Sequence, residues 1–386
     1  MAARRAFVVV IDACGAGALP DAADYGDAGA DTLRHVAEAA GGLDLPVLGR
    51  LGLGSIAPPL AGVAPAADPV LHGRLHPLGP GKDTTTGHWE LMGVVTPAPL
   101  PTYPEGFPPE IVDRLRAATG RDVLCNRPYN GLDAILDHAD EHVATGALIV
   151  YTSADSVLQI AAHEAVVPRA ELYAACAAAR AIMTGEHTVG RVIARPFAGE
   201  SGAYARTLGR RDYSIDPPGR SYLDELGAAG VAVHAVGKVG NVFAGVGIGA
   251  EHPGATNAQA IASTEALMDG LDAGLVFTNL VETDQVYGHR KDVPGFHRAL
   301  QAIDAAVGRW LERLDPARDL LVITADHGCD PTTPGTDHTR EHAPLHARFA
   351  GHAGRRHDGP LADVGATCLD WLAGARADGL PGASFR

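Results

Sequence analysis

An apolar run that ends in metal-ligand side chains is the strongest chemical signal in this chain. Residues 321–325 lead directly into Asp326 and His327, and His338 follows across a loop that contains proline and glycine. Carboxylates and neutral imidazoles are natural ligands of divalent cations. A strand that ends in such side chains places them at the carboxyl edge of a sheet, where open α/β folds bind their ligands. The pattern therefore predicts a metal site at a strand end.

Two other apolar runs end in the same kind of side chain. Residues 6–11 run into Asp12, and residues 274–281 are followed by Asp284 and His289. A single aspartate after a strand is often only a turn or helix-cap residue. Three strand ends that repeat the same chemistry favour a metal site instead. The six candidate ligands are too many for one ion and fit two: Asp12, Asp284, His289, Asp326, His327 and His338.

A threonine-rich string supplies a candidate nucleophile. Residues 84–86 are three threonines, preceded by Lys82 and Asp83 and followed by Gly87. A hydroxyl held between two cations can be activated as a nucleophile. A threonine-rich turn before a helix is also an ordinary N-cap, and the string by itself favours that cap.

The elements that must position these residues alternate between strand-like and helical stretches. Apolar runs such as residues 231–236 and 320–323 alternate with Ala/Leu-rich stretches such as residues 171–183 and 295–314. This alternation predicts an α/β architecture. The core must then bring several strand ends to one edge.

Two proline-rich stretches, residues 96–109 and 216–219, suggest an inserted domain. The segment between them is on the order of 115 residues, a normal domain size, and contains none of the six candidate ligands. We therefore expect a metal-bearing core made of residues 1–98 and 214–386, with residues 99–213 forming the inserted domain. One large sheet with proline-rich loops is the alternative.

Composition excludes several classes of protein. The formal net charge of −15 argues against a surface for nucleic acid or anionic membranes. The five scattered cysteines form no CxxC pair, which argues against a disulfide framework and fits a reducing cytoplasm. No segment reaches the roughly 18 apolar residues of a membrane span. We expect a cytoplasmic protein without nucleic-acid or membrane partners.

Several long strings resemble the phosphopentomutases, a family of the alkaline phosphatase superfamily, and the resemblance covers nearly the full length. The strings are residues 81–90, 150–164, 190–197, 288–290, and 324–331 with 335–341. The resemblance implies an alkaline-phosphatase-like core, with a mostly parallel central sheet flanked by helices, and a smaller inserted α/β cap domain that closes over a sugar phosphate.

The resemblance also implies roles for individual residues. Thr84 would carry a phosphoryl group and bridge two Mn²⁺ ions, although Mg²⁺ or Zn²⁺ would also suit the ligands. One ion would take Asp12, Asp326 and His327, and the other Asp284, His289 and His338. The substrate-facing positions would be Ser153, Asp155, Arg191 and Lys238.

The activity implied is interconversion of ribose 1-phosphate and ribose 5-phosphate, and of the 2-deoxyribose phosphates, with a sugar bisphosphate as activator. The chain departs from the family pattern at residues 130–132, 209–212, 282–284 and at Asn241. Because several of these lie in or near the cap, a mutase acting on another pentose phosphate is an alternative, as is a metal-dependent phosphatase of the same superfamily. A non-catalytic binding protein would require a lost ligand, and all six are present. The sequence leaves the oligomeric state open.

Overall fold

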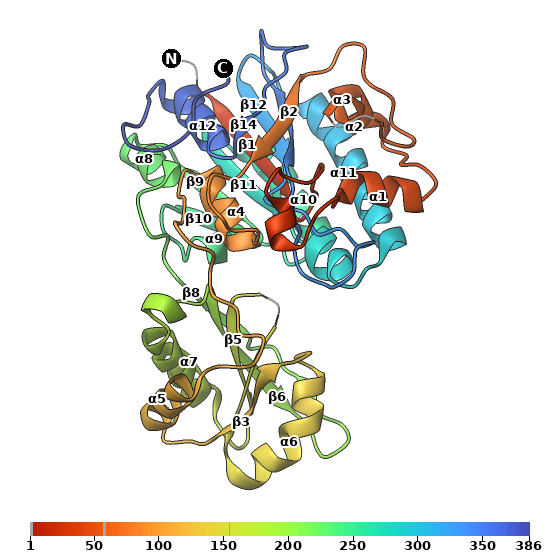
Figure 1. The fold of residues 1–386 in the computed structure, drawn as a ribbon. Helices are drawn as coiled ribbons and strands as arrows, with labels where there is room; N and C mark the ends of the chain where they lie inside the picture. The colour runs from red at the N-terminus through yellow and green to blue at the C-terminus, as the bar shows by residue number, and fades with distance from the viewer. Residues whose placement is uncertain (1–2, 57–58, 154) are drawn as a thin grey trace. The chain divides into compact units, whose positions relative to one another are not determined.

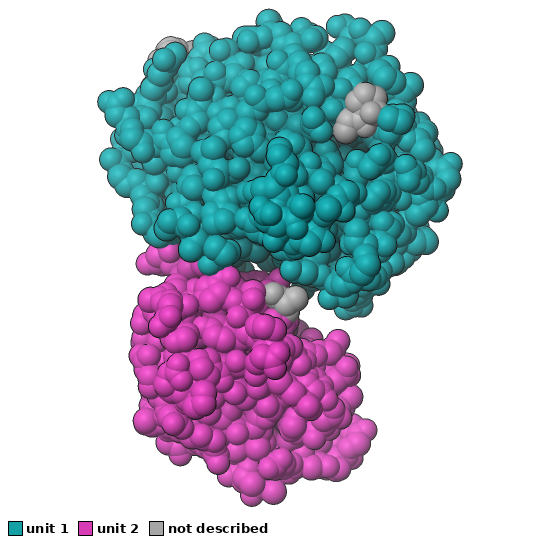
Figure 2. Space-filling view, viewed as in Figure 1, with its two compact units in different colours: residues 1–99, 217–386 teal, residues 100–216 magenta. Residues whose placement is uncertain are grey.

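The chain divides into two compact units in the computed structural model, which describes residues 3–56, 59–153 and 155–386. Unit 1 comprises residues 1–99 and 217–386, and unit 2 comprises residues 100–216 (Figure 2). Each unit has its own sheet, so the single-sheet alternative does not hold. The role of unit 2 as a cap stays a prediction.

Unit 1 is built on an eight-stranded sheet in the order β10-β9-β11-β1-β12-β13-β2-β14. Strands β10, β9, β11, β1 and β12 run parallel, whereas β13 is antiparallel to both β12 and β2. The predicted α/β core with a mostly parallel sheet is therefore confirmed. The strands are β1 (Arg5–Ile11), β2 (Leu71–His76), β9 (Val233–Val236), β10 (Ala250–His252), β11 (Gly274–Leu280), β12 (Asp319–Thr324), β13 (Ala343–Arg348) and β14 (Gly359–Pro360).

The three central strands, β11, β1 and β12, are buried along their whole length. Helices cover both faces of a parallel sheet, so such strands have continuous apolar sequences rather than alternating ones. One group of helices packs together around α11, and a second group around α12 (Figure 1). The first contains α1 (Thr32–Ala39), α2 (Pro46–Leu51), α10 (Asn257–Gly270) and α11 (Val293–Arg313), and the second α4 (Thr84–Leu91), α8 (Tyr222–Ala228), α9 (Val239–Val242) and α12 (Asp363–Ala373).

Local sequence signals explain where the longest helix begins and which face it buries. At the start of α11 the side chain of Asp292 accepts a hydrogen bond from the backbone of Gly295, with a proline in the first turn. Its buried residues recur at helical spacing, which buries one face: Phe296, Ala299, Leu300, Ile303, Val307 and Trp310. The short elements of unit 1 are η1 (Ala22–Tyr25), α3 (Leu53–Ile56) and the π-helix η3 (Thr283–Gly288).

Unit 2 has a six-stranded mixed sheet with helices on both faces. The order is β3-β4-β5-β6-β7, with β8 also paired to β6. Alternate residues of β4 separate two cores: Val150 packs with helices α5 and α7, and Tyr151 packs with α6. The elements are α5 (Pro109–Thr119), β3 (Val123–Pro128), α6 (Asp133–Thr145), β4 (Leu148–Thr152), β5 (Val157–His163), α7 (Arg169–Ile182), η2 (Gly185–His187), β6 (Arg191–Ala198), β7 (Ala205–Arg206) and β8 (Arg211–Ser214).

Among the residues that the structure describes, no helix combines the length and the apolar character needed to cross a bilayer.

Candidate active site

The carboxyl ends of the three central strands bring the candidate ligands of unit 1 together. In the parallel register Ile11 lies beside Leu280 and Val10 beside Thr324. Asp12 directly follows β1, Asp326 follows β12 by two residues, and Asp284 lies on the π-helix after β11. Side chains that are more than 250 residues apart in sequence therefore meet at one sheet edge.

A first cluster contains Asp12, Asp326 and His327, whose ligand atoms all lie within 4.8 Å of one another. His327 Nε2 is 3.4 Å from both Asp12 Oδ1 and Asp326 Oδ2. These two carboxylate oxygens are buried and accept no hydrogen bond from any residue that the structure describes. Buried carboxylate oxygens without donors are costly, and a bound cation would satisfy them. The residues therefore fit a divalent metal.

A second cluster forms around Asp284. Its Oδ1 lies 3.2 Å from His338 Nε2 and 3.4 Å from His289 Nε2. The rings of His289, His338 and His327 form a row, with centroid separations of 4.7 and 4.1 Å. The structure thus places all six predicted ligands in two adjoining groups.

Backbone carbonyls orient two of the imidazoles. His327 Nδ1 lies 3.0 Å from the carbonyl oxygen of Gly328, and His289 Nδ1 lies 2.6 Å from that of Thr336. A proton on Nδ1 makes each of these hydrogen bonds and leaves Nε2 free to face the carboxylates. Metal-binding histidines commonly donate their second N–H to a carbonyl in this way, which supports the fit to metal ions.

The buried carboxylates of the two clusters favour positive charge on the groups around them. Burial raises the pKa of Asp12, but Lys238 and His327 outweigh it and the net pKa is lowered. The pKa of Asp284 is likewise lowered, because His338 and His289 outweigh its burial. Burial lowers the pKa of His327, yet Asp326, Asp12 and Asp284 together raise it to about 10. A proton and a metal ion therefore compete for His327 Nε2.

Thr84 is the first residue of α4, and its hydroxyl lies beside the first cluster. Thr84 Oγ1 is 3.3 Å from His327 Nε2 and accepts a hydrogen bond from Lys238 Nζ, also at 3.3 Å. The helix cap is Asp83, which accepts hydrogen bonds from the backbone of Thr85 and Thr86. The interpretation of the threonines as the cap is therefore wrong, because a carboxylate just before them does this task.

Lys238 was suggested only by resemblance, and the structure gives its physical basis. It follows β9, which pairs in parallel with β11, so it reaches the same sheet edge. Its Nζ also lies 3.9 Å from Asp12 Oδ2. A lysine between the hydroxyl and a ligand offsets part of the negative charge of the three buried carboxylates.

The other three predicted substrate residues belong to unit 2. Ser153 follows β4, and Asp155 precedes β5. Arg191, the first residue of β6, lies 3.7 Å from Asp155 and 3.6 Å from Asp212. Since Val157 of β5 pairs with Arg191, the sheet holds these side chains at one end of the unit.

Sequence reasoning missed three residues at the site. His88 and Asn279 are fully buried and contact Thr84 and Asp12 respectively, and Cys329 groups with Asp284 and His289. Burial and nearby carboxylates raise the pKa of the Cys329 thiol, which disfavours the thiolate. A usable signal existed for Asn279, an amide inside a mostly apolar strand.

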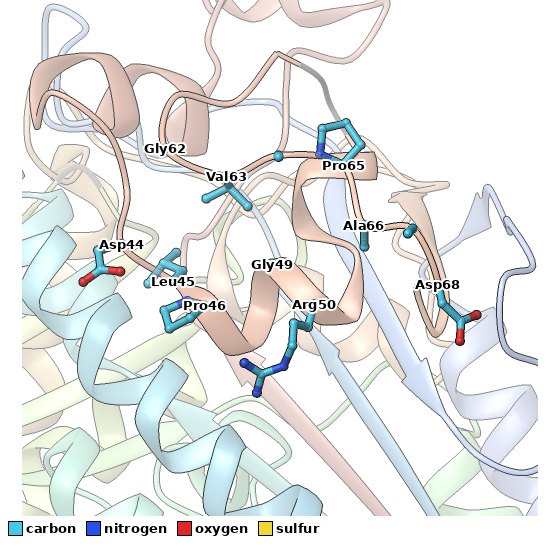
Figure 3. A pocket seen from close by; sticks show the side chains of 12 residues that line it. Asp44, Leu45, Pro46, Gly49, Arg50, Gly62, Val63, Pro65, Ala66 and Asp68 are labelled. Carbon is cyan, nitrogen blue, oxygen red and sulfur yellow. The ribbon is translucent and has the colours of Figure 1, made fainter.

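A separate hollow of about 570 Å³ in unit 1 offers no comparable chemistry (Figure 3). Arg50 is its basic group, and Asp44 and Asp68 are its acidic ones. In the part of the chain that the structure describes, its lining contains no histidine, hydroxyl or thiol. The candidate ligands and the candidate nucleophile therefore lie at the strand-end clusters and not in this hollow.

The fold and the paired clusters fit a metalloenzyme. The family model described as the metalloenzyme superfamily matches residues 4–374, and the chain belongs to that superfamily. A solved structure, the PH0037 protein from Pyrococcus horikoshii, has the same fold, with a TM-score of 0.51 and 14% identity over 98% of this chain and 99% of its own. Together with the candidate ligands, the superfamily supports the use of divalent metal.

Curated relatives narrow the family further. Phosphopentomutase from Anaeromyxobacter sp. (strain K) is 51% identical over 97% of both chains. Phosphopentomutase from Caldanaerobacter subterraneus subsp. tengcongensis is 51% identical over 89% of this chain and 86% of its own, and that from Deinococcus radiodurans is 49% identical over 98% of both. The chain belongs to the phosphopentomutase family and is an enzyme of the isomerase class.

Proposed function

We propose that this enzyme interconverts ribose 1-phosphate and ribose 5-phosphate, and the corresponding 2-deoxyribose phosphates, through a phosphoryl group carried on Thr84. The names of the curated relatives support the pentose phosphate substrate. The position of the Thr84 hydroxyl supports the nucleophile, since it contacts both His327 and Lys238 and lies at a helix N-terminus. The contacts of the Thr84 hydroxyl with His327 and Lys238 are the observation that carries the proposal.

We assign Asp12, Asp326 and His327 to one metal ion and Asp284, His289 and His338 to the other. Mn²⁺ is the proposed ion, on the resemblance to the family, and Mg²⁺ or Zn²⁺ suits the same ligands. Bound there, two divalent ions would neutralise charge on the transferring phosphoryl oxygens.

Phosphorylated Thr84 gives its phosphoryl group to the free hydroxyl of the sugar phosphate. The bond from Thr84 Oγ to phosphorus breaks, a bond from the sugar oxygen to phosphorus forms, and Thr84 Oγ takes up the proton lost by the sugar. Lys238 stabilises the negative charge that develops on Thr84 Oγ as it leaves. The sugar bisphosphate then returns its other phosphoryl group to Thr84, and the phosphate has moved between C1 and C5.

Unit 2 is proposed as the cap that supplies Ser153, Asp155 and Arg191 to the sugar phosphate, with Arg191 binding the non-reacting phosphate. Arginine is suited to bidentate contact with a phosphate. A cap that excludes water protects the phosphoryl group from hydrolysis, which separates a mutase from a phosphatase. A sugar bisphosphate is the proposed activator, because it can phosphorylate an unmodified Thr84.

The deciding experiment uses purified, Mn²⁺-loaded enzyme with ribose, 2-deoxyribose and arabinose phosphates. The isomerised sugar phosphate and free phosphate are measured together, and intact-mass spectrometry follows Thr84. We expect isomerisation of the first two sugars with little free phosphate and a phosphoryl group on Thr84. Net phosphate release would instead support the phosphatase, and a preference for arabinose the mutase with another sugar.

Location in the cytoplasm and the absence of nucleic-acid and membrane partners remain predictions from composition.

A further inference from the structure

We propose that His88 is a positioning residue that joins the nucleophile helix α4, through Asn279, to Asp12 of the first metal cluster. The inference rests on the proposed role of Thr84. It adds that one buried imidazole, which lies in close contact with Asp326, ties the first turn of α4 through Asn279 to Asp12.

His88 lies four residues after Thr84, one helical turn along the same side of α4. Its side chain is fully buried. Nδ1 is 2.9 Å from the carbonyl oxygen of Thr84 and 3.0 Å from Asp326 Oδ2, and Nε2 is 3.1 Å from Asn279 Nδ2. The ring therefore contacts the nucleophile residue, a metal ligand and the central strand β11.

The partners of the ring determine which nitrogen carries the proton. Asn279 Nδ2 donates to Asp12 Oδ2 at 3.0 Å, because an ionised carboxylate can only accept. The second N–H of the same amide points to His88 Nε2, which must accept it. Nδ1 then carries the proton and donates it to the carbonyl oxygen of Thr84. The chain Asp12–Asn279–His88–Thr84 thus has one consistent donor order.

The packing around the ring leaves it little freedom. The ring of Phe277 on β11 stacks against His88 with centroids 5.6 Å apart. A Cβ atom at Gly87 would lie 2.4 Å from the carbonyl oxygen of Asp326, so only glycine lets α4 approach this closely. The nucleophile helix and Asp326, two residues beyond β12, therefore meet directly at Gly87.

This arrangement couples the position of Thr84 to that of the ligands. A shift of the first turn of α4 would move the Thr84 hydroxyl relative to Asp326, and misplacement by about 1 Å can cost roughly 100-fold in rate. Loss of the Nδ1 donor would leave the buried carbonyl of Thr84 with one hydrogen-bond partner fewer. The first turn of α4 would then be free to shift.

A pair of substitutions separates the two nitrogens. In His88→Asn the side-chain amide lies near the former Nδ1 and can still donate to Thr84. In His88→Gln the longer amide reaches the former Nε2 and leaves the Nδ1 position empty. We expect His88→Gln to lose about 100-fold in kcat with KM within about threefold, and His88→Asn to retain at least a tenth of the wild-type kcat.

Each rate is divided by the fraction of chains that a sugar bisphosphate can phosphorylate on Thr84, measured by intact mass, so that misfolded protein does not count. Elemental analysis gives the metal content. His252→Gln, which alters a histidine hydrogen-bonded to His234 outside the clusters, is the matched control and should behave as the wild type.

Equal kcat values for the Asn and Gln variants, or a larger loss in the Asn variant, would overturn the role of His88. If His88→Gln does not fold, His88→Asn carries the test alone, and a loss of more than 100-fold would overturn the inference. Failure of wild-type Thr84 to become phosphorylated would instead refute the proposed function, which keeps the two claims apart.

Discussion

Lys238 and Thr84 are 154 residues apart in sequence, yet the ammonium of Lys238 donates a hydrogen bond to the Thr84 hydroxyl at 3.3 Å. The lysine follows the end of β9, and the threonine begins α4. The positive charge therefore lies where negative charge would develop as a phosphoryl group leaves Thr84.

Replacing Lys238 with methionine should slow phosphoryl transfer by about 100- to 1,000-fold, the usual effect of removing one preorganised charge from a transition state. Rapid-quench measurement of Thr84 phosphorylation by a sugar bisphosphate tests this step directly. Lys238→Arg, which keeps the charge, should lose less. A methionine variant with the wild-type rate would remove Lys238 from the mechanism.

Thr84→Ala should abolish turnover and leave no phosphoryl group on the protein, while the fold is retained. Thr85→Ala is the matched control and should remain active. Thr86 Oγ1 donates to Asp83 Oδ2 at 2.8 Å, so Thr86→Ala should mainly cost stability, about 1 kcal/mol. Peptide mapping by mass spectrometry identifies the modified residue, and a phosphoryl group on Thr85 would contradict the assignment.

Metal binding should strengthen as pH rises. In the metal-free enzyme the carboxylates raise the pKa of His327 to about 10, so below that pH an ion must displace a proton. The affinity of the first site should increase about tenfold per pH unit between pH 6.5 and 9. Isothermal titration calorimetry in buffers of different ionisation enthalpy would count the released proton. A pH-independent affinity would contradict this competition.

The same shift predicts how the metal-free protein responds to pH. The folded-state pKa of His327 lies above its unfolded value of about 6.5, so the protonated group stabilises the fold fully below about pH 6.5. That contribution is lost as pH rises through 10. His327→Gln should flatten the decline in the free energy of unfolding over this range, as measured by urea denaturation in the presence of a chelator.

Full occupancy should be two metal ions per chain, because each cluster supplies three side-chain ligands. Elemental analysis of enzyme prepared with Mn²⁺ gives the stoichiometry. His289→Ala should remove one ion and spare the other, since His289 contacts Asp284 of the second cluster, whereas Asp12 belongs to the first. A wild-type stoichiometry of one would refute the two-ion assignment.

Arg191→Ala should reduce mutase turnover by about 100-fold, because a misplaced sugar phosphate reacts slowly. Metal content and phosphorylation of Thr84 should stay near wild type if Arg191 serves the non-reacting phosphate. Arg191→Lys keeps the charge but loses bidentate contact, so its turnover should lie between those of the wild type and Arg191→Ala. An unchanged turnover would exclude this role for unit 2.

The central strands were predictable because parallel strands covered on both faces have continuous apolar sequences. Residues 6–11 and 274–281 matched β1 and β11 closely, and the ligands followed from the polar residues just beyond them. The partners of each ligand were not predictable. His88 and Asn279 are 191 residues apart in sequence, and their contact depends on α4 packing against β11. The local sequence pattern carries no information about which distant residues come into contact.

The order of synthesis has a consequence for how the enzyme becomes active. Ile11 pairs beside Leu280, and β12 follows later still, so the ligand-bearing edge of the sheet cannot exist until most of the chain has left the ribosome. Unit 2, whose strands all come from residues 123–214, can fold well before that point. Acquisition of metal is therefore a late event in the maturation of the protein and reports that both ends of the chain have come together.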